Sequence, residues 1–391
     1  MKLGAIWWFV SDLHLDPDGA DPRGTDGTLA DFVDAVVLDS GAPGRHLVLL
    51  GDTFQLSKAQ VGSGNIGLRI RETVAGFPRA FAGLRRCLAN GVEVHFVCGN
   101  HDYPLMSPQH RAELSRSLAA APDNPGALPR FHCWLLHEPG LFYAEHGNQH
   151  DELSRLPMLL RAARTDGVES LPATPLQALA DARHADSSSW RKAVVLASSI
   201  AGMVRSERRS RSPEYAALLA EHAVAGLSTQ VVQALHEVSR ASALRTVART
   251  GRRVVQRHLG VADYDSYLRL AARRIDDILT TDGPRPLCYV FGHSHVATLE
   301  ELPVRGAWYA GTGTWSHRHH RRGDNKNPRQ FPFVVTSTSS AGRQVALRHW
   351  DAATGEVVSS STPTGDCRGL PAWAGIAGGG NPPVRRDLGR P

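Results

Sequence analysis

Residues 5–14 read AIWWFVSDLH, an apolar run that passes directly into a polar cluster. Six consecutive apolar residues, rich in aromatic and β-branched types, predict a buried strand. The run is short, and neither a charged stretch before it nor a cleavage-like site after it indicates a leader peptide. We therefore expect a core strand over Ala5–Val10, followed at once by Ser11-Asp12-Leu13-His14.

The same pattern, a strand that ends in polar residues, occurs twice more in the first 150 residues. The two further examples are His46–Leu50 before Gly51-Asp52 and Val92–Val97 before Gly99-Asn100-His101-Asp102. Helix-like stretches lie between the strands, at Leu29–Leu38 and Ile70–Leu88, which gives an α/β rhythm. In open α/β sheets, functional groups gather beyond the carboxyl ends of the strands, so we expect these clusters to converge on one rim.

A different texture, rich in Ala, Leu and Arg at helical spacing, covers residues 153–278 and predicts several helices. Strand texture then returns in four stretches: Leu287–Phe291, Ala307–Ala310, Phe333–Ser337 and Val345–Trp350. From residue 359 onward Gly, Pro, Ser and Thr dominate, which predicts a disordered tail. We therefore expect one α/β domain (residues 1–151 and 286–358), a helical insertion (152–285) and a tail (359–391).

The formal charge of +6 is concentrated in this insertion. Residues 152–285 contain 20 Lys and Arg against 14 Asp and Glu, a surplus of six. Such a surplus favours anionic partners, namely nucleic acid, a phospholipid surface or a phosphorylated substrate, although a solvated helical face explains any single cluster equally well. The apolar run Val194–Val204 is shorter than the about 20 residues that span a bilayer. It indicates either a buried helix or a peripheral membrane contact.

The cysteines are five in number, widely scattered and without a C-x-x-C pair: Cys87, Cys98, Cys133, Cys288 and Cys367. This usage argues against a disulfide framework and against a structural zinc knot. We therefore expect a reducing compartment and a cytoplasmic location.

Seven side chains beside strand ends or glycines have the types that suit two neighbouring metal ions. They are Asp12, His14, Asp52, Asn100, His146, His293 and His295. Two cations about 3.5–4 Å apart can hold both a hydroxide and the phosphoryl oxygens of an ester. Carboxylates neutralise and bridge the cations, imidazoles suit zinc or iron, and an amide oxygen completes a site without adding charge. The histidine pair in Gly292–His295 is also costly to bury unpaired, and metal ligation would satisfy it.

Five motifs, in this order, resemble those of the calcineurin-like metallophosphoesterases. They are D-x-H at Asp12–His14, G-D at Gly51-Asp52, G-N-H-D at Gly99–Asp102, H-G at His146 and G-H-x-H at Gly292–His295. The resemblance covers about residues 5–150 and 286–350. It implies an α/β fold, specifically a four-layer αββα sandwich of two mixed β-sheets flanked by helices, here with an inserted α-helical cap.

The resemblance also implies a role for each of these residues. One metal ion would be held by Asp12, His14 and His295, and the other by Asn100, His146 and His293, with Asp52 bridging both. The ions would be Mn, Fe or Zn. His101 would contact the substrate phosphate and assist the leaving group, oriented by Asp102. The implied reaction is hydrolysis of a phosphate monoester, diester or pyrophosphate by a metal-bound hydroxide.

Two assignments have local alternatives. His132, His137 and His150 lie near His146, which we favour because a glycine follows it and because it fits the resemblance. Asp151 could orient a metal-bound imidazole or cap the helix that follows it.

The segment Gly311–Trp315, with the basic run at residues 317–322 behind it, is a candidate for substrate contact. Similar Gly-Thr-Trp segments occur near the site in the superfamily that the motifs resemble. A solvated basic loop is the alternative for the basic run.

The substrate has competing interpretations. A nuclease would use the same centre, but the insertion offers few aromatic residues for base stacking: Trp190, Tyr215, Tyr264 and Tyr267. A non-catalytic scaffold with this fold would have lost ligands, whereas all seven are present. We therefore expect a small-molecule or lipid-linked phosphorylated substrate, with the insertion as a cap beside the site. Superfamily members that cleave lipid-linked pyrophosphates carry such a helical lid.

Overall fold

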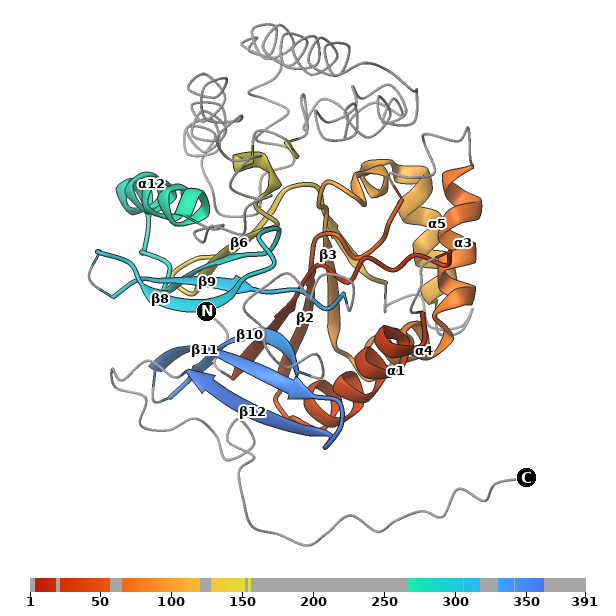
Figure 1. Cartoon of the computed structure of the whole chain (residues 1–391). Helices are drawn as coiled ribbons and strands as arrows, with labels where there is room; N and C mark the ends of the chain where they lie inside the picture. The colour runs from red at the N-terminus through yellow and green to blue at the C-terminus, as the bar shows by residue number, and fades with distance from the viewer. Residues whose placement is uncertain are drawn as a thin grey trace, which may run out of the picture.

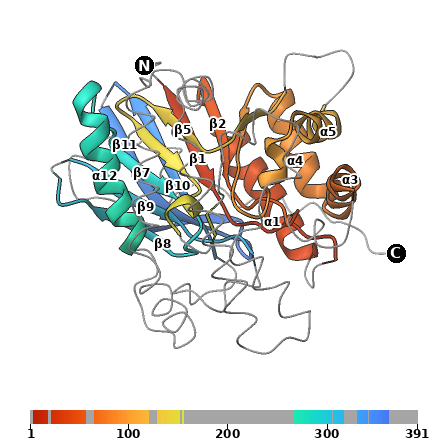
Figure 2. The same ribbon diagram turned by 90° about the horizontal axis from the view of Figure 1, so that it is seen from above.

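The computed structural model describes residues 4–18, 22–56, 65–119, 128–151, 154–155, 266–304, 306–316, 330–340 and 342–361. These residues form two mixed β-sheets packed face to face, with helices on both outer sides (Figures 1 and 2). The arrangement is the αββα sandwich that the sequence predicts. Of the expected insertion at 152–285, only residues 154–155 and the last part, from Ser266, lie among the described residues.

The first sheet has seven strands in the order β12-β11-β10-β1-β2-β3-β4. Their bounds are β1 Ala5–Val10, β2 Gly44–Leu50, β3 Glu93–Val97, β4 Arg130–His132, β10 Gln330–Ser339, β11 Gly342–Asp351 and β12 Glu356–Ser361. Strands β1 to β4 are parallel, and β10 joins β1 in antiparallel pairing. The carboxyl ends of the four parallel strands therefore point to one edge.

Strand β1 lies inside this sheet and is covered on both faces. Ile6, Trp8 and Val10 pack into the core shared with the helices, whereas Trp7 and Phe9 pack into the core between the sheets. Successive side chains of a strand point to opposite faces, so a strand with two buried faces is apolar throughout. This explains why the opening run does not alternate with polar residues.

The second sheet has five strands in the order β5-β6-β7-β9-β8. Their bounds are β5 Leu135–Glu138, β6 Phe142–Glu145, β7 Cys288–Phe291, β8 Ala297–Glu301 and β9 Trp308–Thr312. Strands β6, β7 and β9 are parallel to one another, and β5 and β8 pair antiparallel at the two edges. The parallel pairing of β6 with β7 brings residues 142–145 next to residues 288–291 despite the long stretch of chain between them.

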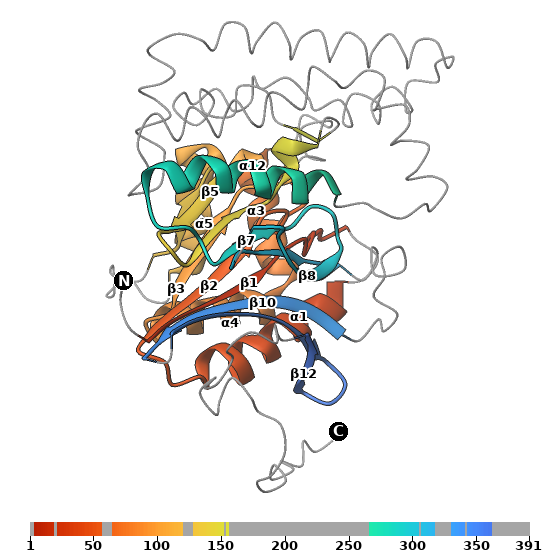
Figure 3. The ribbon, with the colours of Figure 1, turned by 90° about the vertical axis from the view of Figure 1, so that its left-hand side faces the viewer.

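Helices cover the outer face of each sheet: α1, α3, α4 and α5 lie on the side of the first sheet, and α12 lies on the side of the second (Figures 2 and 3). The α-helices are α1 Pro22–Phe32, α3 Ile66–Gly76, α4 Pro78–Ala89, α5 Pro108–Leu118 and α12 Ser266–Asp282, and the short helices are η1 Val33–Leu38, η2 Tyr103–Met106 and η3 Asn148–His150. The helical stretch expected over Ile70–Leu88 is two helices, because Pro78 cannot continue a helix and instead starts α4.

Helix α12 belongs to the sandwich rather than to a cap. Its buried residues recur at helical spacing, and they are Leu268, Ala271, Ala272, Ile275 and Leu279. They join the same core as Tyr289 and Phe291 of β7. Helix α12, expected within the insertion at 152–285, therefore packs with the second sheet, and β12 continues to Ser361, past the expected boundary at 358.

The apolar run Val194–Val204 lies outside the described residues. Among the residues that are described, no helix combines the length and the apolar character needed to cross a membrane.

Two leucines of α12 test its packing. Leu268 is fully buried, so Leu268→Ala should lower the free energy of unfolding by about 2–5 kcal/mol. Leu270 is 43% exposed on the same helix, and Leu270→Ala should change that free energy by no more than about 0.5 kcal/mol. Denaturant unfolding followed by circular dichroism measures both. Equal losses from the two variants would contradict the packing of α12 on the second sheet.

Candidate metal centre

Polar clusters from both sheets meet at one end of the sandwich. The strands that deliver them are β1 (Asp12, His14), β2 (Asp52), β3 (Asn100, His101, Asp102), β6 (His146) and β7 (His293, His295). The loops after β1 and β2 are joined by backbone hydrogen bonds from Asp12 N–H to Gly51 O at 3.1 Å and from His14 N–H to Asp52 O at 2.8 Å. The two sheets are joined where His293 N–H donates to Asp12 Oδ2 at 3.1 Å.

Five of the seven expected ligands adopt a left-handed backbone conformation. The positive φ angles are 53° at Asp12, 50° at His14, 51° at Asp52, 64° at His293 and 61° at His295. No other non-glycine residue in the described part of the chain has a positive φ. Such a conformation costs about 1–3 kcal/mol per residue and persists only where its surroundings enforce it. This strain is confined to the positions that the motifs single out.

Two glycines allow the clusters to approach closely. A Cβ atom on Gly51, whose φ is +85°, would lie 2.3 Å from Nδ1 of His146. A Cβ atom on Gly99 would lie 2.3 Å from Oδ1 of Asp52 and 2.8 Å from Cδ2 of His146. The loops after β2, β3 and β6 can therefore meet only because these two positions have no side chain.

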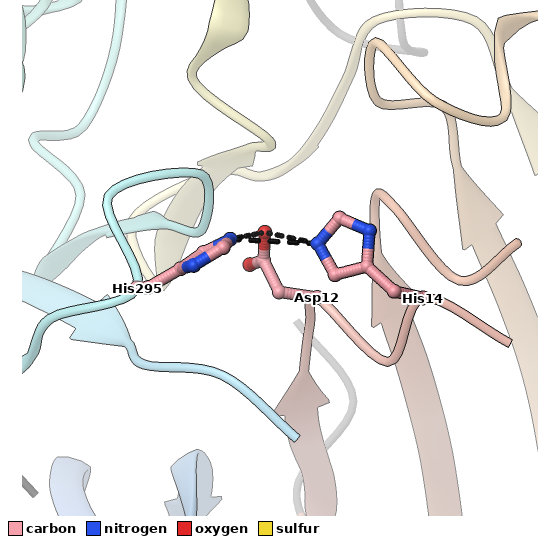
Figure 4. A group of neighbouring side chains, drawn as sticks. All are labelled: Asp12, His14 and His295. Carbon is pink, nitrogen blue, oxygen red and sulfur yellow. Dashed lines mark hydrogen bonds and ion pairs between the residues drawn. The ribbon is translucent and has the colours of Figure 1, made fainter. Parts of the chain in front are cut away.

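The first group consists of Asp12, His14 and His295, with the carboxylate between the two rings (Figure 4). Nε2 of His295 lies 3.0 Å from Asp12 Oδ1, Nε2 of His14 lies 3.8 Å from the same oxygen, and the two Nε2 atoms are 3.4 Å apart. A point equidistant from three atoms at these separations lies about 2.0 Å from each, which matches the bond lengths of zinc to nitrogen and oxygen.

The carboxylate and backbone of Asp12 are held by the second sheet. Ser11 Oγ donates to Asp12 Oδ2 and lies 2.6 Å from Thr312 Oγ1. Thr314 Oγ1 and the Trp315 N–H both donate to Asp12 O, at 3.0 and 3.2 Å. The segment Gly311–Trp315, a candidate for substrate contact from its sequence, therefore supports the Asp12 loop. The basic run behind it lies outside the described residues.

The second group consists of Asp52, His146 and His293. His146 donates through Nδ1 to Leu50 O at 2.9 Å, which turns its Nε2 toward Asp52 Oδ2 at 3.2 Å. His293 bonds through Nε2 to Asp151 Oδ2 at 2.9 Å, so it would ligate a metal through Nδ1. Asp151 thus has the orienting position that was one of its two alternatives.

The three histidines that competed with His146 lie in other environments. His150 bonds to the buried carboxylate of Glu145, and His132 bonds to His95. His137 is buried on β5 with no hydrogen-bond partner for either ring nitrogen. His146 is the member of this set whose ring contacts Asp52.

Three buried atoms expected to bind metal differ in their partners: Asp12 Oδ1 and His146 Nε2 have ion-pair partners in His295 and Asp52, whereas Asn100 Oδ1 has no hydrogen-bond partner. Asn100 itself is 5% exposed and stands between Gly99 and His101. Leaving a buried polar atom unsatisfied costs about 1–3 kcal/mol, so such atoms are rare without a reason. The donor set of carboxylates, imidazoles and one amide oxygen fits two transition-metal ions.

Gln55 joins two histidines of the centre and was not predicted from the sequence. Its Oε1 lies 3.0 Å from His14 Nδ1, and its Nε2 lies 2.7 Å from His101 Nδ1. Both rings therefore turn Nε2 toward Asp52 Oδ2, at 4.0 and 3.9 Å. The available signal was a polar residue between the apolar Phe54 and Leu56, three positions after Asp52.

The hydrogen bonds of Asp102 in the structure are with the backbone. Its two carboxylate oxygens accept hydrogen bonds from the backbone of Gly99 at 2.6 Å and of Thr53 at 2.8 Å. It therefore fastens the loop after β3 to the loop after β2, and the amide of Gln55 holds the ring of His101. Burial, reinforced by the nearby Asp52, raises the pKa of Asp102 to about 7.

Charges inside the centre balance one another. Burial would raise the pKa of Asp52, but His146 and His101 hold it well below its usual range. Burial would lower the pKa of His146, but Asp52 and Asp12 raise it to about 10. The Asp52 carboxylate is thus the charge that a cation beside His146 would compensate. His14 differs, because burial lowers its pKa to about 3 and keeps the ring neutral, as ligation requires.

Comparisons with known proteins give structural neighbours only. No model of a protein family matches the chain, and no curated protein matches it in sequence. One neighbour is a candidate 5'-nucleotidase from Staphylococcus aureus, in complex with α-ketoglutarate, which is 12% identical with a TM-score of 0.31. The match covers 88% of this chain but only 53% of the nucleotidase, so this chain spans about half the length of that protein. The phosphopantetheinyl hydrolase from Mycobacterium tuberculosis is 14% identical with a TM-score of 0.26, covering 82% and 93% of the two chains. Both scores lie below 0.5, so the chemistry must follow from the residues themselves.

Gly99 provides a test of the close approach of the loops. Gly99→Ala places a methyl group within 2.3 Å of the Asp52 carboxylate, so the carboxylate must move and metal content should fall. Gly283 has open space around its Cβ position, and Gly283→Ala should leave metal content unchanged. Elemental analysis of both variants after purification without chelator measures the effect. Full metal content in Gly99→Ala would contradict the described geometry.

Proposed function

We propose that this protein is a metal-dependent phosphoesterase of the calcineurin-like type, which hydrolyses a phosphate ester or anhydride at a binuclear centre. The observation that carries the proposal is the convergence of two groups of ligand-type side chains, Asp12 with His14 and His295, and Asp52 with His146 and His293. The buried Oδ1 of Asn100, which has no hydrogen-bond partner, supports it. A bound cation would remove the cost of leaving that oxygen unsatisfied. The left-handed backbone at five of the expected ligands supports the same conclusion.

The two groups of side chains suggest how the ions would be held. The first would be bound by Asp12, His14 and His295, and the second by Asn100, His146 and His293, with Asp52 shared. Asp52 suits the shared position because its Oδ2 faces both His14 and His146, whereas its Oδ1 accepts from the His101 backbone N–H at 2.8 Å. Mn, Fe and Zn all suit such mixed ligands.

When bound, the two ions would activate a water molecule as the nucleophile and neutralise the phosphoryl oxygens. His101 would act on the leaving group. Its Nδ1 accepts from the Gln55 amide, so its ring proton is on Nε2, which faces the centre. From that position His101 can donate a hydrogen bond to a phosphate oxygen or a proton to the leaving oxygen.

The substrate would approach the centre from the side of His101 and His295. Their side chains are 27% and 24% exposed, whereas those of Asp12, Asp52 and His146 are buried. A phosphorylated small molecule or a lipid-linked phosphate is the substrate class we propose. In the sequence, residues 156–265 lie between Arg155 and the start of helix α12. Helix α12 contacts η3, next to His146. A segment inserted there is suited to select among substrates, and a lipid substrate would bring it to a membrane surface.

Asp52 tests whether the centre is binuclear. The purified protein should contain close to two equivalents of transition metal and hydrolyse nitrophenyl phosphate or bis-nitrophenyl phosphate. Asp52→Asn should lose metal from both positions and lose hydrolysis with it, because the carboxylate is shared. The control is Asp26→Asn, since Asp26 accepts a hydrogen bond from the Ala80 N–H and an amide oxygen can replace its carboxylate there. Full metal content and activity in Asp52→Asn would refute the proposal.

His101 separates catalysis from metal binding. His101→Ala should keep both metal equivalents but reduce kcat by roughly 10²- to 10⁴-fold, because it removes a proton donor and not a ligand. The control is His110→Ala. His110 lies on α5 and is bonded to the backbone oxygen of Pro104, so this variant should retain activity. Loss of metal together with activity in His101→Ala would make His101 a ligand instead.

Variants of Gln55 test whether this residue positions the rings of His14 and His101. Gln55→Leu removes the hydrogen bonds to both rings, so kcat should fall while the metal content stays near two. Gln55→Glu retains an oxygen for His14 but cannot donate to His101, and the pH dependence of kcat should shift with it. A merely structural Gln55 would leave the pH profile of both variants like that of the parent protein.

A further inference from the structure

A second cluster of histidines lies on the strands of the first sheet rather than in the loops that carry the candidate metal centre. His46 is on β2, Glu93 and His95 are on β3, and His132 is on β4. His46 pairs with Glu93 in the register of the sheet, and His95 faces the same side as Glu93 because the two are separated by one residue. His46 is five residues before Gly51, a distance of about 16 Å along an extended strand.

Three ligand-type atoms of this cluster form a compact triangle. Nδ1 of His46 and Nε2 of His95 are 3.3 Å apart, and Oε2 of Glu93 lies 3.6 Å from the first and 3.8 Å from the second. The point equidistant from these atoms lies about 2.1 Å from each, which is the length of zinc–nitrogen and zinc–oxygen bonds. The separations also approach the ligand–ligand edge of a tetrahedral site, about 3.4 Å at that bond length.

Neighbouring side chains fix both rings in this orientation. Trp7 stacks on His46 with ring centroids 3.6 Å apart and an angle of 6° between the planes. Nδ1 of His95 is bonded to Nε2 of His132 at 3.1 Å, which leaves Nε2 of His95 directed at His46 and Glu93. Metal-binding histidines usually bond through their other nitrogen in this way.

We propose that His46, Glu93 and His95 form a separate metal site for a single Zn²⁺ or a similar divalent transition-metal ion. Two imidazoles and one carboxylate are the ligands that such ions take, with a fourth position for water. The cluster uses none of the residues of the candidate centre, so this inference does not rest on the proposed function. A bound ion would link β2 to β3 directly and β4 through His132.

Arg130 would oppose binding. Its guanidinium is 3.0 Å from the same Glu93 Oε2, so it competes with a cation for that oxygen. This contact provides a variant in which binding should improve. Arg130 is 62% exposed, which makes its replacement tolerable for the fold.

The experiment is equilibrium dialysis of the full-length protein against Zn²⁺, with bound zinc counted. His46→Ala should bind one equivalent less than the parent protein, and Glu93→Gln should weaken that equivalent by at least 10- to 100-fold. Arg130→Gln should tighten it severalfold. His349→Ala, which removes a histidine of β11 outside both clusters, should bind as the parent does.

Long-range ¹H–¹⁵N NMR of the histidine rings identifies the location. Zinc should shift the ring nitrogens of His46 and His95, whether or not the candidate centre retains its own ions. Asp52→Asn should lose zinc from the candidate centre but keep the zinc equivalent that depends on His46. This result would distinguish failure of the proposed function from failure of the second metal site. Equal zinc binding by His46→Ala and the parent, with unmoved His46 and His95 signals, would overturn the proposal and leave the cluster a hydrogen-bonded chain of histidines.

Discussion

Asp52 is the group through which the two halves of the candidate centre contact each other. Its carboxylate is 2% exposed, yet it faces His14, His101 and His146, and its other oxygen is held by a backbone N–H. A buried carboxylate is tolerated only when positive charge and hydrogen bonds surround it. The glycines that admit its neighbours, the loop fastened by Asp102 and the inward direction of His146 all follow from this requirement.

The parts of the fold that could be predicted from the sequence are those with a local signal. Ala5–Val10 stands out because a strand covered on both faces is continuously apolar, and Gly99–Asp102 because glycine and polar residues follow a strand abruptly. The position of α12 could not be predicted in this way. Its sequence resembles the Ala-, Leu- and Arg-rich stretch before it, and only the packing of Leu268 and Ile275 on the second sheet assigns it to the sandwich. Strand β12 was missed because its serines resemble the tail.

Within the candidate centre, too, the residues with a local sequence signal could be predicted and those without one could not. Asp12, Asp52, His146 and the pair in Gly292–His295 carry motif patterns, and the structure brings them together. Gln55 carries no such pattern, because its role depends on the separation of two rings that come from different strands. The role expected of Asp102 followed from the family resemblance, and what its motif could not show is that the carboxylate accepts hydrogen bonds from the backbone N–H groups of Gly99 and Thr53. Sequence identifies the residue types at a site better than it identifies which of them touch.

The left-handed residues have a consequence for how this protein can evolve. Glycine adopts such angles without a steric penalty, whereas Asp and His at these five positions carry a backbone cost. That backbone cost acts against Asp and His, and the function of their side chains would offset it. A lineage that lost this function would be expected to drift toward glycine or a relaxed loop at these positions before the sheets themselves changed. The residue types at these five positions would thus indicate whether the chemistry of the centre is still under selection.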